Sequence, residues 1–148
     1  MNPLRLLAVV LVAALMSGCA DEARYDEVAR VASADHALEA VLSESSGGAT
    51  TTFTYHVHVV AAGGAVSGNP LAILVGATRN AEAYGANLAW SGARRLEVRF
   101  LDAKSTRRDD AALATLGNGV ELVLMPGLSD ASAPAGGMRY NRERTGTR

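Results

Sequence analysis

The chain has 148 residues, 49% of them hydrophobic, and a formal net charge of −1 at pH 7. This charge argues against nucleic acid as a partner, because a nucleic-acid-binding domain needs a basic face. The length suffices for one modest hydrophobic core but not for two domains. The single cysteine, Cys19, excludes an internal disulfide, so burial and backbone hydrogen bonding must hold the fold together.

Residues 1–18 are expected to be a signal peptide. Arg5 gives a cationic start, and the apolar run at residues 6–16 is shorter than the roughly 20 residues of a membrane-spanning helix. The segment Leu15-Met16-Ser17-Gly18-Cys19 resembles the lipobox of bacterial lipoproteins, with Met16 where that motif usually has Leu, Val or Ile. This resemblance implies that the Cys19 thiol carries diacylglycerol and that its amine is acylated, with palmitate for example, after cleavage. The alternative is a plain secretory signal with an incidental cysteine.

Membrane lipid is therefore the first expected partner, through acylated Cys19. Several acyl chains on one residue anchor firmly, because each buried methylene contributes about 0.8 kcal/mol. Ala20 follows the cysteine where an aspartate would favour the inner membrane, and by resemblance to enteric lipoproteins this favours the periplasmic face of the outer membrane. We expect a tether at residues 19–26, a β domain at residues 27–127 and a flexible basic tail at residues 128–148.

Residues 27–46 fit two structures. Alanine, glutamate, leucine and arginine favour a helix here. The segment also fits a hairpin with a turn at residues 34–37, because Leu38, Ala40 and Leu42 alternate with other residues in the second half. Propensity alone favours the helix.

The segment from Thr50 to Val60 carries the clearest strand pattern in the chain. β-Branched and aromatic residues alternate strictly with threonine and histidine, so the two sets must face opposite sides. The expected inward set is Phe53, Tyr55, Val57 and Val59, and the expected outward set is Thr50, Thr52, Thr54, His56 and His58.

The remaining chain predicts short strands separated by loops. Strands are expected at residues 71–78, 87–90, 95–103 and 120–126, with a glycine-rich loop at 61–70 and a charged linker at 104–119 that holds a short helix over 109–116. The predicted fold class is mainly β: a single small antiparallel sheet or meander, blade-like or a small sandwich, preceded by a signal-peptide helix. The open face of such a sheet must be covered by its own curl, a second layer or another protomer.

Four segments resemble a group of small bacterial envelope proteins of unknown function: SADHALEAVL, GGATTTFTYHVHVV, LVGATRNAEAYG and NLAWSGARRLEVRF. The similarity covers residues 31–100, is most specific at Gly48-Ala49-Thr50-Thr51, and also looks like one blade of a β-propeller. The family pattern has an Asp-Gly turn where this chain has Asp35-His36. It therefore implies a hairpin over 27–46, with His36 at positive φ, where histidine is enriched.

His56 and His58 are the metal-site candidates. Their Cα atoms, about 6.6–7 Å apart on one strand face, could share a zinc or copper ion. Such a site needs a third and usually a fourth ligand. The candidates for the third ligand are Glu97, Glu121 and His36, and no sequence motif places them beside the pair. The favoured interpretation is a solvated row of threonines and histidines with no bound metal.

No enzyme signature is present, and no cofactor is expected. Ser67 and Ser91 lack a G-x-S-x-G elbow, and the loop at 61–68 does not match G-x-G-x-x-G. The leading hypothesis is a non-enzymatic, lipid-anchored envelope protein that presents Thr50, Thr52 and Thr54 to another envelope protein. The alternative is a periplasmic metal-binding or small hydrolytic domain that uses His56 and His58. A third hypothesis is a sheet edge that pairs with a partner strand.

Overall fold

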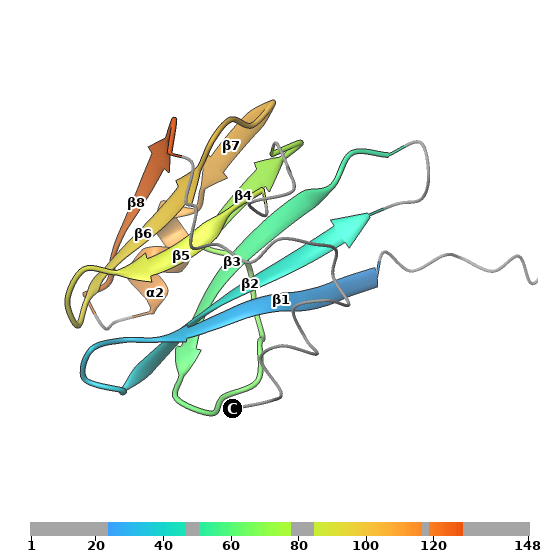
Figure 1. The fold of residues 1–148 in the computed structure, drawn as a ribbon. Helices are drawn as coiled ribbons and strands as arrows, with labels where there is room; N and C mark the ends of the chain where they lie inside the picture. The colour runs from blue at the N-terminus through green and yellow to red at the C-terminus, as the bar shows by residue number, and fades with distance from the viewer. Residues whose placement is uncertain (1–23, 47–50, 78–84, 117–118, 129–148) are drawn as a thin grey trace, which may run out of the picture.

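The computed structural model of the chain describes residues 24–46, 51–77, 85–116 and 119–128. The predicted signal peptide, Cys19, Thr50 and the tail from residue 129 lie outside the described residues. The described part is mainly β, as predicted, and its strands form two sheets packed face to face (Figure 1). None of its helices has the length and apolar character needed to span a membrane.

The larger sheet has five antiparallel strands in the order β1-β2-β3-β4-β7. Their bounds are Arg24–Ala32 (β1), Leu38–Ser46 (β2), Thr54–Ala61 (β3), Ala72–Val75 (β4) and Ser105–Arg108 (β7). β1 begins inside the predicted tether at residues 19–26, so the β domain starts three residues earlier than expected. β7 falls in the segment predicted as a charged linker.

The smaller sheet has three strands in the order β5-β6-β8. Their bounds are Asn87–Trp90 (β5), Arg95–Phe100 (β6) and Glu121–Pro126 (β8). β5 and β6 are antiparallel, whereas β6 and β8 are parallel, which is the one parallel pair among the described strands of a mainly antiparallel fold. A parallel pair needs a crossover connection, and β7 and the helix α2 (Asp110–Thr115) lie in it. This helix falls within the predicted range 109–116.

The hairpin over residues 27–46 is confirmed, and the helix alternative is wrong. His36 has a φ of 54°, which makes it the one described non-glycine residue at positive φ. The Ser33 hydroxyl donates to Asp35 Oδ1 at 2.6 Å, and the Ala37 amide donates to the same oxygen at 3.2 Å. Arg94, in the turn between β5 and β6, donates to Asp35 Oδ2 at 2.8 Å. The hydrogen bonds that the Asp35 side chain accepts therefore stabilise the turn by more than the helix propensity of the alanines favours a helix.

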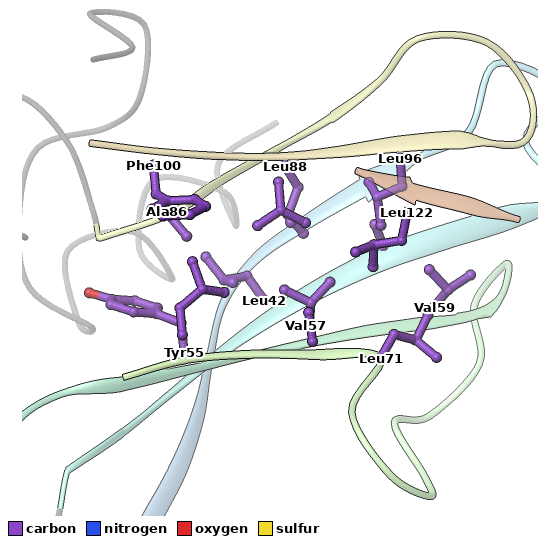
Figure 2. Close-up of a cluster of buried hydrophobic side chains, with 14 of the residues drawn as sticks. Leu42, Tyr55, Val57, Val59, Leu71, Ala86, Leu88, Leu96, Phe100 and Leu122 are labelled. Atoms are coloured by element: carbon purple, nitrogen blue, oxygen red, sulfur yellow. The ribbon is translucent and has the colours of Figure 1, made fainter. Parts of the chain in front are cut away.

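The core lies between the two sheets, and the predicted alternation of β3 determines one of its walls. Tyr55 and Val57 are fully buried and Val59 is almost so, whereas the intervening residues point to the other face. Figure 2 shows the inward side chains of the two sheets meeting across the core. They are Leu42, Tyr55, Val57, Val59 and Leu71 on one side and Ala86, Leu88, Leu96, Phe100 and Leu122 on the other.

Candidate functional site

The two candidate histidines lie on the outer face of the larger sheet, away from the core. His56 is paired in register with Ser43 of β2 and Ile73 of β4, and His58 with Val41 of β2. The predicted side of β3 is therefore confirmed. The prediction that the row is solvated is wrong for His58, because only 9% of this residue is exposed.

The two imidazoles have different surroundings. His56 Nε2 lies 3.0 Å from the Ser45 hydroxyl, and the Tyr25 ring meets the His56 ring edge-on with centroids 5.0 Å apart. Burial lowers the pKa of His56, and repulsion from a protonated His58 lowers it further. Burial alone lowers the pKa of His58. Both rings are therefore biased toward the neutral form at neutral pH.

The structure does not bring the candidate third ligands to the histidines. Glu97 and Glu121 lie on the outer face of the smaller sheet, where they pair with arginines at 2.6 and 2.7 Å, and His36 lies in the β1–β2 turn. Within the described ranges, no group of three or more His, Cys, Asp or Glu residues is placed to hold a metal ion. A metal bound to His56 Nε2 would also have to displace the Ser45 contact of that nitrogen.

The threonine row does not form a free edge. Thr52 accepts a hydrogen bond from the Lys104 ammonium at 3.2 Å, which ties it to the chain just before β7. Thr54 is paired with Ser45 on one side and Val75 on the other, because β3 is an interior strand. The backbone of β3 is thus used within the sheet.

One edge of the sandwich is closed. The Trp90 indole N–H of β5 donates to the Val31 carbonyl of β1 at 2.9 Å, which joins the two sheets. β1 also carries a bulge between Glu27 and Ala29. Near it, Arg30 bridges Glu27 at 2.8 Å and Glu39 at 2.6 Å. Bulges and paired charges on an edge strand discourage the addition of another strand.

The opposite edge, formed by β7 and β8, is open. All of β7 is exposed, and β8 has no neighbour beyond β6 in the described part of the chain. A groove of about 420 Å³ runs between them, lined by Arg108 of β7 and by residues 121–124 of β8. The Arg108 guanidinium reaches across it and donates to the Leu122 carbonyl at 3.3 Å.

The free side of β8 presents backbone polar groups at alternate residues. The Glu121 amide donates inward to the Arg94 carbonyl, so the amides of Leu122 and Leu124 point to the free side. The contact between Arg108 and the Leu122 carbonyl agrees with this direction. Pro126 ends the row, because proline has no amide to donate. An added strand could therefore pair with β8 at Leu122 and Leu124.

Apolar side chains flank this free edge. Val123 and Met125 are half-buried on the outer face of the smaller sheet, and Leu124 packs against the core. An apolar edge strand with few charges is a template for another strand. The sequence predicted the strand at residues 120–126 but not its edge position, because that position depends on the crossover and on the parallel pairing with β6.

Comparisons of this chain with protein-family models, with curated proteins and with solved structures find no match.

Proposed function

We propose that this chain is a non-enzymatic, lipid-anchored protein of the bacterial cell envelope. Its β-sandwich binds an extended segment of another envelope protein along β8. The lipobox at residues 15–19 supports the anchor. β1 begins at Arg24, so the chain between Cys19 and the β domain spans less than about 20 Å even when extended. The domain would therefore stay close to the lipid surface.

The observation that carries the binding proposal is the groove beside an unpaired, apolar edge strand. β-Strand addition gains affinity from main-chain hydrogen bonds, and the side chains beside the edge select the sequence. Here the main-chain groups of Leu122 and Leu124 would supply the hydrogen bonds. Val123 and Met125 would contact alternate side chains of the added strand on the outer face. Arg108 Nη1 would lose its carbonyl contact and contact an acidic residue of the partner instead, while Arg108 Nε keeps its ion pair with Asp110 at 2.7 Å.

The anchor is tested with Cys19→Ala in cells. The variant is expected to keep its leader and to lose the mobility shift that acylation produces, because the thiol that accepts the lipid is missing. Met16→Leu is the matched control, since it brings the motif closer to the usual lipobox and should process normally. Normal processing and membrane retention of Cys19→Ala would refute the anchor.

The binding edge is tested by photocrosslinking in cells from a benzoylphenylalanine placed at Met125. We expect one discrete adduct that disappears when Val123→Lys is added, because a lysine on an edge strand discourages strand addition. Ala89→Lys is the matched control. Ala89 of β5 and Val123 of β8 flank the same residue, Glu97 of β6, on the same face. The proposal would be refuted if Val123→Lys and Ala89→Lys reduce the adduct equally, or if no adduct forms at all.

A further inference from the structure

A second cavity, separate from the β8 groove, lies at the end of the sandwich where β3 leaves the sheet. Its volume is about 390 Å³, which is within the range of small-molecule sites. Three segments line it: the end of β3, the loop that returns to β4, and helix α2. One wall is apolar, with Val59, Leu71 and Leu116. Polar side chains occupy the rest: His58, Ser67, Asn69, Asp109 and Thr115.

His58 is the feature that points to a ligand. It is 91% buried, since only 9% of the residue is exposed, and it lines the cavity. Within the described residues, no hydrogen bond or ion pair reaches either ring nitrogen. Its ring nitrogens are not fully buried, so a ligand in the cavity can reach them, and a neutral imidazole offers that ligand one donor and one acceptor.

The charge of the lining selects the ligand class. Asp109 is the one residue among the described lining that carries a formal charge at neutral pH, and no lysine or arginine lines the cavity. Its Oδ1 accepts the Ala112 amide at 2.9 Å as the cap of α2. The remaining carboxylate capacity and the acceptor nitrogen of His58 favour a cation, and the site would repel an anion.

We propose that this cavity, formed by the end of β3, the β3–β4 loop and α2, binds a small organic amine. The ammonium group donates to Asp109 and His58, and the apolar part of the ligand lies against Val59, Leu71 and Leu116. Ser67, Asn69 and Thr115 provide further hydrogen-bonding groups around the head of the ligand. This site does not depend on the β8 edge.

Three probes with the same four-carbon body and different head groups test the charge selectivity: butylammonium, butanol and butyrate. The full chain is titrated in detergent micelles, and the amide chemical shifts of residues 109–116 report the site. Butylammonium is expected to saturate these shifts at millimolar concentration and to bind at least about tenfold more tightly than butanol, because a charge-assisted hydrogen bond is stronger than a neutral one. Butyrate is expected to bind most weakly.

Asp109→Asn is the decisive variant. Asparagine caps a helix as well as aspartate does, so α2 should remain while the charge is lost. In this variant, butylammonium should bind no more tightly than butanol. Both titrations use the same micelles, so any binding of the probes to the detergent is the same for the variant and for the unchanged chain. Val123→Lys should leave amine binding unchanged, which separates this site from the β8 edge. Equal affinity for butyrate, a preference that survives Asp109→Asn, or no saturable shift with any probe would overturn the proposal.

Discussion

The backbone conformation of His36 in the β1–β2 turn predicts how substitutions there change the free energy of unfolding. An L-amino acid in the left-handed region costs about 1–2 kcal/mol, and His36 sits there with a φ of 54° and an exposed side chain. Glycine removes that cost, but its larger conformational freedom in the unfolded chain costs about 0.5–1 kcal/mol. His36→Gly should therefore raise the free energy of unfolding by about 0 to 1.5 kcal/mol. His36→Val should lower it by about 1 kcal/mol, because a β-branched residue fits this region poorly.

Urea denaturation, followed by the fluorescence of the single tryptophan, Trp90, measures these changes. Ala37→Gly is the matched control. Ala37 is exposed in the same turn and does not have positive φ, so glycine there should lower the free energy of unfolding by about 0.5–1 kcal/mol. The reasoning fails if His36→Gly destabilises as much as Ala37→Gly does, or if His36→Val leaves stability unchanged.

Three further predictions concern the sandwich itself. Trp90→Phe should cost about 1 kcal/mol in unfolding free energy, because the ring stays but the bond to the β1 carbonyl is lost; an unchanged urea midpoint would contradict the closed edge. Gly85→Ala should cost about 1–3 kcal/mol by calorimetry, because the added Cβ would overlap the Tyr55 ring. Burial lowers the pKa of His56 and His58, so the unfolded chain binds more protons than the folded chain when the pH drops below about 6.5. The free energy of unfolding should therefore fall with the pH in this range, by at most about 1.4 kcal/mol per pH unit for each histidine. Replacing both with glutamine should flatten that slope, and a slope of opposite sign would refute the argument.

Local alternation was enough to predict β3 and its orientation in the larger sheet. Tyr55 and Val57 face the core because successive side chains of a strand face opposite sides, which holds wherever the strand lies in the sheet. The same rule also carries Glu44 to the inward face beside Leu42, and Glu44 is fully buried. A pattern based on hydrophobicity alone would have placed a glutamate outside. At Glu44, the alternation of the strand therefore determines orientation more than the residue type does.

The features that the sequence did not predict depend on contacts between distant segments. β7 has the sequence STRR, all exposed, so no apolar alternation marks it as a strand. Its strand character comes from pairing with β4. The burial of His58 likewise depends on tertiary surroundings rather than on the alternation within β3. The open edge follows from the crossover that brings β8 parallel to β6, and no local pattern encodes a crossover.

The strand that would follow the proposed anchor and the open edge lie on opposite sides of the domain. β1, the strand nearest to Cys19 in the chain, forms the closed edge with β5, while β7 and β8 form the edge across the sandwich (Figure 1). Four strand spacings of about 4.8 Å separate β1 from β7, so the groove lies about 19 Å from the strand that the lipid would hold. Under the proposed function, a short tether at β1 would therefore hold the closed edge near the membrane and would leave β8 accessible to a partner in the periplasm. Had the chain entered the fold at β8, the same tether would have covered the edge that strand addition needs.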